Sequence, residues 1–221
     1  MDEILLANFM VFHDLTREEH YDLWIGDESW ELDYYLHENP EQKTAAYAWW
    51  LGYRDDERVW LVTVGGSGVG GPLLRKVIAA YPEARDRVPD LRMIVVSGPR
   101  IDPASLPAHD GLEIRPYVHD LYRHLAACDL AVVQGGLTTT MELTASRRPF
   151  LYFPLRDHFE QNLHVRHRLE RYRAGGCLDY DGTTPADIAA ATASEIGRDV
   201  DYHPVATDGA ARAAAMLASL L

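Results

Sequence analysis

A glycine-rich turn follows an apolar run, Val59–Val64, that reads as a β-strand. The turn is Gly65–Gly71 (GGSGVGG), and Pro72 comes directly after it. Glycine lets the backbone approach a phosphate closely, and proline suits the first turn of a helix. The free N–H groups at the start of that helix attract an anion. This pattern predicts a phosphate-binding turn, and a tight strand-to-helix turn without a ligand is the alternative.

The same glycines leave a nicotinamide cofactor open as a second interpretation. Gly66, Gly68 and Gly71 match the dinucleotide fingerprint. That fingerprint expects an acidic residue at the end of the second strand, about 20 residues on. The second apolar run ends much later, at Ser97–Arg100 (SGPR), without a carboxylate. A P-loop is excluded because Gly71 precedes Pro72 rather than Lys.

A second constellation starts where the apolar run Leu130–Val133 meets two glycines. Gly135 and Gly136 open the backbone, and the threonines from Thr138 onward offer N-cap hydroxyls at a helix start. Glu142 lies about one helical turn beyond Thr138, so both can face one crevice. A diphosphate at the helix start and a ribose diol on Glu142 would fit this pattern. A capped helix with a solvated glutamate is the alternative.

A third group of polar residues follows the apolar run Phe150–Phe153. Parallel sheets place ligands at the carboxyl ends of their strands. Side chains suited to binding hydroxyl groups gather there, in Asp157, Glu160, Gln161 and Asn162. The three histidines His158, His164 and His167 lack the spacing of a zinc site, and Asp179-Tyr180-Asp181 resembles a polar turn more than a metal-binding motif. We therefore expect no metal.

Composition narrows the class of protein. The chain of 221 residues carries 21 Lys+Arg against 34 Asp+Glu, a formal net charge of −13. This balance argues against a general nucleic-acid binder. Two cysteines without metal spacing, no basic leader and no bilayer-length apolar run predict a cytoplasmic protein. Seven arginines between Arg147 and Arg173 form a local basic patch, fit to steer an anionic donor or a lipid phosphate, unless it is a solvated face.

The elements that must position these residues alternate along the chain. Near-continuous apolar strands separated by helices indicate a doubly wound α/β fold with a parallel, Rossmann-like sheet. The expected strands are Val59–Val64, Leu91–Val96, Leu112–Ile114, Leu130–Val133, Phe150–Phe153 and Cys177–Leu178. The expected helices are Leu73–Tyr81, Asp120–Cys128, Thr138–Ser146, Glu160–Arg173, Pro185–Ile196 and Ala206–Leu221.

The first part of the chain differs in character and is expected to be an αβ appendage. We place the domain boundary after residue 58, which gives domains 1–58 and 59–221. The first sixty residues hold all five tryptophans, and they predict a helix at Glu3–His13, a strand at Tyr21–Gly26 and a helical or looped segment at Ser29–His37.

The order of these motifs resembles a known family. VTVGGSGVGGP, PYVHDLYRHLAACDLAVVQGGLTTTMEL and RRPFLYFPLRDHFEQNLHVRHRLERYRAGG are similar to the donor-binding C-terminal half of GT-B glycosyltransferases, above all family 28, the family of the peptidoglycan enzyme MurG. The similarity covers about residues 59–200. It implies a UDP-sugar donor, inversion at the anomeric carbon, no cofactor and no obligatory metal.

The resemblance also implies roles for single residues. The diphosphate would lie against both glycine turns, and the uracil would lie beside the third strand. The ribose would bind to Glu142, and the transferred sugar would lie near Glu160 and Gln161. The donor-binding residues would be Gly66, Ser67, Tyr117, Val118, Gly135, Gly136, Leu137, Thr138, Glu142, His158, Glu160 and Gln161.

One departure from the family shapes the functional expectation. GT-B enzymes have two Rossmann-like domains, and this chain has room for one. We expect a glycosyltransferase donor half that transfers GlcNAc or another hexose, with no catalytic residue assigned and Asp27, Glu28 and His37 as the candidate bases. The alternatives are a non-catalytic UDP-sugar-binding subunit and a nucleotide-sugar epimerase. An acceptor-domain partner or a second copy would dock on the Trp-rich segment, and a lipid-linked acceptor would bring the protein to the inner face of the membrane.

Overall fold

The computed structural model describes residues 2–27, 32, 35–36, 38–50, 52–66 and 68–219. The chain forms two compact units, Met1–Arg54 and Asp55–Leu221. The sequence placed the boundary after residue 58, whereas Arg58 is already the first residue of a central strand of the second unit. The two units therefore divide four residues earlier, between Arg54 and Asp55.

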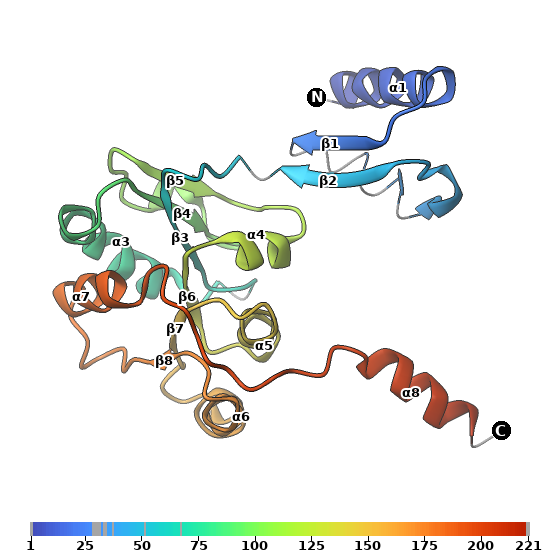
Figure 1. Cartoon of the computed structure of the whole chain (residues 1–221). Coiled ribbons are helices and arrows are strands. Elements are labelled where there is room, and N and C mark those ends of the chain that lie inside the picture. Colours follow the sequence, from blue (N-terminus) through green and yellow to red (C-terminus); the bar gives the residue numbers. More distant parts are fainter. Residues whose placement is uncertain are drawn as a thin grey trace. The chain divides into compact units, whose positions relative to one another are not determined.

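The second unit is built on a six-stranded parallel sheet with the order β5-β4-β3-β6-β7-β8 (Figure 1). The chain starts in the middle, moves to one edge and returns to the other, as in a doubly wound fold. This confirms the predicted fold class. The strands are β3 (Arg58–Thr63), β4 (Leu91–Val96), β5 (Leu112–Arg115), β6 (Leu130–Gln134), β7 (Phe150–Phe153) and β8 (Gly176–Cys177).

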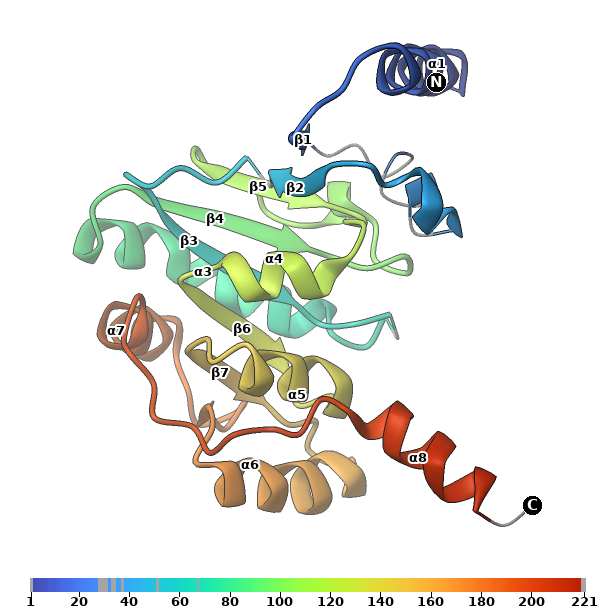
Figure 2. The same ribbon diagram turned by 45° about the vertical axis from the view of Figure 1, so that its right-hand side comes forward.

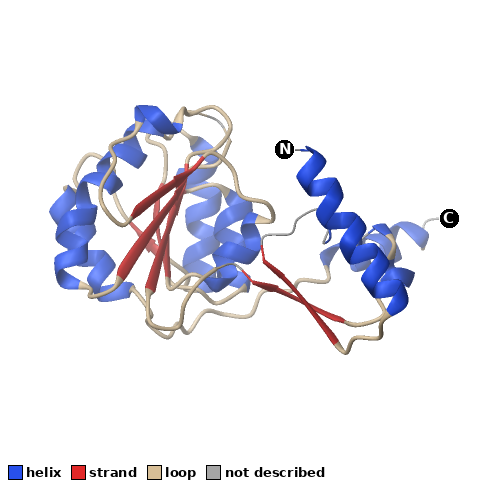
Figure 3. Cartoon of the chain, turned by 90° about the horizontal axis from the view of Figure 1, so that it is seen from above, coloured by secondary structure: helices blue, strands red, loops and turns tan. Residues whose placement is uncertain are grey.

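Helices cover both faces of the sheet (Figure 3). They are α3 (Gly71–Arg87), α4 (Leu121–Ala127), α5 (Leu137–Ala145), α6 (Arg166–Tyr172) and α7 (Pro185–Glu195), with short turns at η2 (Pro103–Ser105) and η3 (Glu160–Val165). The last helix, α8 (Gly209–Ala218), extends away from the sheet and has no buried residue (Figure 1). In the described part of the chain, no helix is both long and apolar enough to cross a lipid bilayer.

Two helices differ from their predicted bounds for physical reasons. The sequence ended the first helix at Tyr81 because Pro82 follows, but α3 continues to Arg87. Proline removes one backbone hydrogen bond from a helix. Pro82 itself is exposed, while buried Tyr81 and Ala84 hold the helix against the core, and this burial offsets the lost hydrogen bond. The predicted helix Glu160–Arg173 begins as a π-helix, η3, before it becomes α6.

The core lies between the sheet and the helix pair α3 and α7. Trp60 of β3, Val132 of β6 and Ile78 of α3 have no exposed surface, and Ile188 of α7 packs in the same cluster. Burying a side chain of this size stabilises the fold by about 1.5–3 kcal/mol. The middle strands are therefore apolar on both faces, as a parallel sheet between two helix layers requires.

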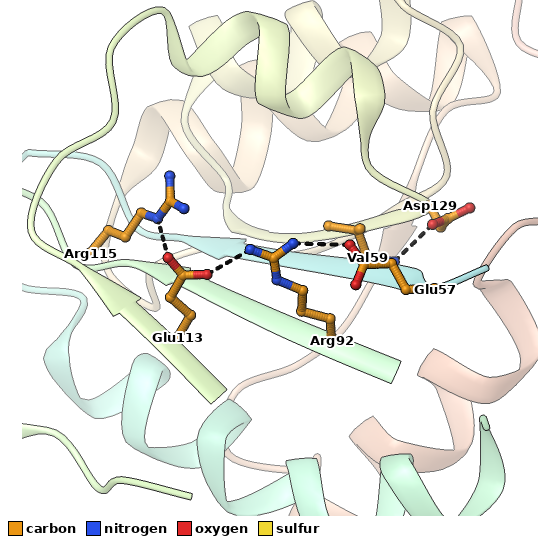
Figure 4. Close-up of polar contacts among 6 residues, drawn as sticks. All are labelled: Glu57, Val59, Arg92, Glu113, Arg115 and Asp129. Atoms are coloured by element: carbon orange, nitrogen blue, oxygen red, sulfur yellow. Dashed lines mark hydrogen bonds and ion pairs between the residues drawn. The ribbon is translucent and has the colours of Figure 1, made fainter. Parts of the chain in front are cut away.

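A row of charged side chains crosses the edge half of the sheet (Figure 4). Arg92 on β4 donates to Glu57 at 2.9 Å and to Glu113 of β5 at 2.8 Å, and Arg115 donates to the other oxygen of Glu113. Burial alone would raise the pKa of Glu113, but the two arginines outweigh it and lower the pKa. The row joins three neighbouring strands through side chains.

The first unit contains a helix and a two-stranded parallel sheet. Helix α1 (Asp2–Glu18) precedes β1 (Leu23–Asp27), and the short turn η1 (Pro40–Gln42) precedes β2 (Ala46–Trp50). The helix is longer than the predicted Glu3–His13, and strand β2 was not predicted. In β2 bulky aromatic residues follow each other without the alternation that marks a half-buried strand. The predicted segment Ser29–His37 lies largely outside the described residues.

We predict that Arg92→Met lowers the free energy of unfolding by about 1–3 kcal/mol at about pH 7, because it leaves two partly buried carboxylates without their shared cation. Glu113 has a lowered pKa, so its contribution is present above its unfolded pKa of about 4.3 and is lost as the pH falls through the folded value. The difference in the free energy of unfolding between variant and wild type should therefore shrink as the pH falls towards about 3. Urea unfolding at both pH values measures it.

The matched control is Arg87→Met, which removes the exposed pair with Glu83 on α3. Exposed pairs contribute about 0.3–0.5 kcal/mol. An equal loss in both variants would show that the row across the sheet has no special role.

Candidate functional site

The site is a crevice at the carboxyl ends of β3 and β6. These two strands are neighbours, but the connections that leave them run in opposite directions, through α3 to β4 and through α5 to β7 (Figure 2). At such a switch point the two loops separate and leave a space above the sheet. Both predicted glycine turns, after β3 and after β6, border it.

A cavity of about 190 Å³ occupies this position. It brings together Gly66, Gly136 and Gln161, which the sequence predicted from three separate segments. Backbone and small side chains form most of its wall. The lining residues are Thr63, Val64, Gly65, Gly66, Val133, Gln134, Gly136, Thr139 and Gln161.

The first glycine turn is packed tightly on one side and open on the other. A Cβ on Gly70 would lie 2.2 Å from the Cβ of Val64, so only glycine fits there. A Cβ on Gly98, after β4, would lie 2.5 Å from the carbonyl oxygen of Gly65. Gly66 by contrast has no atom within 4 Å of its ideal Cβ position. Its backbone is accessible to a ligand, while Ser67 lies outside the described residues.

The second turn leads into α5 without a side-chain cap. Gly136 is the N-cap residue, and its ideal Cβ position also has no neighbour within 4 Å. The prediction that threonine hydroxyls cap this helix is wrong. Thr140 donates to the carbonyls of Gly136 and Leu137 at 2.8 and 3.1 Å, and Thr144 donates to that of Thr140 at 2.7 Å. The threonines bond backward along the helix, which leaves the N–H groups of the first turn for another acceptor.

Glu142 is a half-buried carboxylate on α5, one turn beyond the exposed Thr138. Burial raises its pKa, and no opposite charge acts against that effect. A carboxylate in this position costs free energy until it accepts hydrogen bonds. It is therefore ready to accept them from a polar ligand. Leu137, also on the first turn, is exposed.

The third predicted group has a divided role. Gln161 is buried, and its side-chain oxygen accepts the N–H of Leu155 at 2.9 Å, so its NH₂ group is left for the cavity that it lines. Asn162 holds the loop instead, because its amide lies 2.6–3.1 Å from the carbonyls of Leu155, Arg156 and His158. Both side chains, which lie in the π-helical turn η3, bond to the backbone of Leu155. His158 and Glu160 are exposed.

The predicted uracil-binding residues follow β5 and precede α4. Tyr117 is 67% exposed, whereas Val118 is buried. A planar ring could stack on the free face of Tyr117. Any contact with Val118 would come from its backbone, because its side chain belongs to the interior.

A second, more apolar cavity of about 210 Å³ adjoins the first, with Gln134 lining both. Arg156 and Asp181 form an ion pair beside it. Asp179 accepts the N–H of Gly182 at 2.6 Å. Both aspartates therefore have protein partners, as expected of a polar turn. In the part of the chain that the structure describes, no three acidic, histidine or cysteine side chains cluster in a way that could hold a metal ion.

Other predicted residues cannot be placed in this geometry. Glu28 and His37 lie outside the described residues, and of Asp27 only the backbone in β1 is described. Among the tryptophans, Trp24 and Trp60 are buried, so the expectation of an exposed patch is wrong for these two. Trp30 is outside the described residues, and Trp49 and Trp50 are described only as backbone of β2.

Sequence reasoning did not assign a ligand contact to Gln134, and it gave Gly65 and Thr139 only as members of the two turns, not as single binding residues. Gln134 closes the otherwise apolar strand β6 and is buried, with 6% exposure. A polar residue ending an apolar strand just before a glycine pair was a usable signal. Gly65 has a φ of 73°, a value that favours glycine.

Comparison with known proteins agrees with this architecture. The model of the glycosyltransferase family 28 C-terminal domain matches residues 60–203, more than half of the chain. A UDP-N-acetylglucosamine–N-acetylmuramyl-(pentapeptide) pyrophosphoryl-undecaprenol N-acetylglucosamine transferase of Symbiobacterium thermophilum is 33% identical over 148 residues, covering 64% of this chain and 38% of the relative. An uncharacterized glycosyltransferase of Methanopyrus kandleri is 29% identical over 171 residues, covering 77% and 47%.

Solved structures share the fold. The calicheamicin glycosyltransferase CalG4 superimposes with a TM-score of 0.52 at 22% identity, over 66% of this chain and 35% of that one. MurG of Acinetobacter baumannii gives 0.50 at 16% identity, over 68% and 47%. The chain thus spans less than half the length of these relatives. Its parallel sheet, its two glycine turns and the match over residues 60–203 lead to one assignment: the chain belongs to the glycosyltransferase family 28 C-terminal domain family.

Proposed function

We propose that the second unit binds the UDP-sugar donor of an inverting glycosyl transfer, with GlcNAc or another hexose as the transferred sugar. The observation that carries this proposal is the cavity at the switch point, where Gly66 and Gly136 both present open backbone. The names of the relatives, which include UDP-N-acetylglucosamine-dependent transferases, support the donor class.

The diphosphate would lie between the Gly66 turn and the start of α5. The first-turn N–H groups of Leu137, Thr138 and Thr139 have no carbonyl one turn earlier to bond. They would donate to the phosphate oxygens, and the partial positive charge of the helix start would add to the attraction. The backward bonding of Thr140 favours this role, because no threonine hydroxyl competes for the N–H groups.

The sugar parts of the donor would meet the remaining polar groups. Glu142 would accept hydrogen bonds from the ribose diol, and the NH₂ of Gln161 would donate to a hydroxyl of the transferred sugar. Exposed Glu160 and His158 would border the same sugar, and the uracil would stack near Tyr117.

In the reaction, an acceptor hydroxyl would attack the anomeric carbon from the side opposite the diphosphate. The new C–O bond forms while the bond to the diphosphate oxygen breaks, and UDP leaves with the electron pair. The charge that grows on the leaving diphosphate would be stabilised by the backbone N–H groups at the start of α5. The proton of the acceptor would pass to a base, for which Asp27, Glu28 and His37 stay the candidates.

The acceptor is proposed to be lipid-linked, because relatives are named for a pyrophosphoryl-undecaprenol acceptor. GT-B folds place the acceptor on a second domain, so a partner chain or a second copy would complete the site, and the protein would work at the inner face of the membrane. A UDP-sugar-binding subunit without activity of its own is the second form of the same proposal.

We predict that Glu142→Gln weakens UDP binding by about 1–3 kcal/mol, which is roughly 5- to 150-fold, because the ribose loses a charged acceptor. Since burial raises the pKa of Glu142, its ionised form destabilises the fold as the pH rises through that value. The variant should therefore unfold no more readily than wild type at neutral pH. Calorimetric titration with UDP and urea unfolding measure the two effects.

Glu170→Gln on α6 is the control, because it removes a carboxylate that pairs only with exposed Arg166. UDP affinity unchanged by Glu142→Gln, or lowered as much by Glu170→Gln, would contradict the role of Glu142.

We predict that UDP binds with the same affinity in EDTA as in Mg²⁺ or Mn²⁺, because backbone N–H groups rather than a cation face the diphosphate. Calorimetry in the two buffers tests this. A strict requirement for the cation would make Asp179 and Asp181 candidate ligands again.

We predict that the chain binds UDP and UDP-sugars but not NAD. The end of β4 carries Arg100 rather than the carboxylate that would accept the ribose hydroxyls of NAD, and Asp102 is occupied as the cap of η2. Arg100 could meet the 2′-phosphate of NADP, so NADP is titrated as well, and NADP binding without UDP binding would favour the nicotinamide interpretation. Titration with each nucleotide decides between the two classes. Conversion of a UDP-sugar to its epimer without any acceptor, seen by product analysis, would favour an epimerase.

A further inference from the structure

A further hollow, distinct from the two cavities described above, opens at the other end of the strands, at the amino ends of β3, β6 and β7. Its volume is about 490 Å³, within the range of small-molecule sites. Its walls are Arg58 at the start of β3, Asp129 directly before β6, residues 147–149 before β7 and residues 197–200 after α7. A strand of this length spans roughly 15–20 Å. The hollow is therefore separate from the switch-point cavity.

The hollow is positive although the chain as a whole is negative. Its lining carries four guanidinium groups and two carboxylates, a formal balance of 4 − 2 = +2. Glu195, 3.1 Å from one of the arginines, lowers the local balance by one. The charged lining residues are Arg58, Arg147, Arg148, Arg198, Asp129 and Asp199.

Within the part of the chain that the structure describes, two of these arginines have no carboxylate partner. Arg147 donates to neutral carbonyls there, those of Val200 at 2.9 Å and Tyr202 at 3.3 Å. Arg148 is half-buried, and its charge opposes the effect of burial that raises the pKa of Cys128 to about 12. Over the described residues, no ion pair joins either arginine to an acid. Neighbouring like charges repel each other, so an anion between them is attracted by both.

The geometry of the hollow is set before any ligand enters. Asp129 is already occupied, because it accepts the N–H of Val59 at 2.8 Å and pairs with Arg58 at 3.1 Å (Figure 4 shows the Val59 contact). A Cβ on Gly197 would lie 3.3 Å from Arg58, so the turn and this guanidinium are in close contact. Hydrogen bonds hold the side chain of Arg147. Groups fixed in this way lose little freedom when they bind a ligand.

We propose that this hollow binds a phosphate group through Arg147 and Arg148. A guanidinium presents a planar pair of donors that matches two phosphate oxygens. A phosphate has more acceptor oxygens and more charge than a carboxylate, so it can satisfy both arginines at once. The phosphate belongs either to a soluble molecule or to the head group of a phosphomonoester lipid, and both present the same chemistry to the hollow.

The soluble source is tested by titrating the whole chain with pyrophosphate and following backbone amide resonances. We expect the amides of Gly197, Arg198 and Val200 to shift, and Arg148→Gln to weaken this binding at least about tenfold. Arg168→Gln, which removes an exposed arginine of α6, is the matched control and should change nothing. Arg147→Gln is the second variant if Arg148→Gln does not fold.

The lipid source is tested by sedimenting the chain with phosphatidylcholine vesicles that contain or lack phosphatidic acid. Retention that depends on phosphatidic acid and is lost in Arg148→Gln assigns the phosphate to a lipid, while a pyrophosphate response without retention assigns it to a soluble molecule. The proposal is overturned if neither probe binds, if only the amides of Gly135 and Gly136 respond, or if Arg168→Gln weakens binding as much as Arg148→Gln.

Discussion

The pairing of β3 with β6 is the contact on which the rest of the second unit depends. These strands run parallel, with Trp60 opposite Leu130 and Thr63 opposite Val133, and side chains from both are fully buried. A parallel pair needs a crossover connection, and right-handed crossovers from neighbouring strands that lead to opposite edges must diverge. The switch-point crevice is the geometric result. Both glycine turns border this crevice, because each follows one of these two strands.

The two ends of the sheet use polar groups in different ways. At the carboxyl ends, glycines expose backbone N–H groups, and the proposed ligand would supply the acceptor oxygens for them. At the amino ends, charged side chains join the strands directly, as Asp129 does for β3 and β6 and Arg92 does for β3, β4 and β5. Arg147 and Arg148 stand apart from that pattern, because their charge is not matched by an acid within the described residues.

Side chains that look alike in the sequence have different tasks in the fold. Thr140 and Asn162 bond to backbone and stabilise a helix and a loop, although the sequence offered Thr140 as a helix cap and Asn162 as a partner for ligand hydroxyls. Glu142 and Gln161 keep free hydrogen-bonding groups, the first because burial removed its water and the second because only its oxygen is used. Whether such a side chain bonds to the protein or keeps a group for a ligand depends on which backbone group lies nearest to it, and packing decides that.

The sequence by itself determined the fold class, the order of the strands along the chain and the segments that border the crevice. These follow from local patterns, since apolar runs, glycine pairs and a helix start are visible without knowing the contacts. Only the tertiary structure decided that α3 runs past Pro82, that η3 is a π-helix, that Gln134 joins the cavity and that Val118 faces inward. Each depends on neighbours that are distant in the sequence. The gathering of four arginines at the start of β3, before β7 and after α7 has the same origin, because a parallel sheet brings the starts of its strands to one edge.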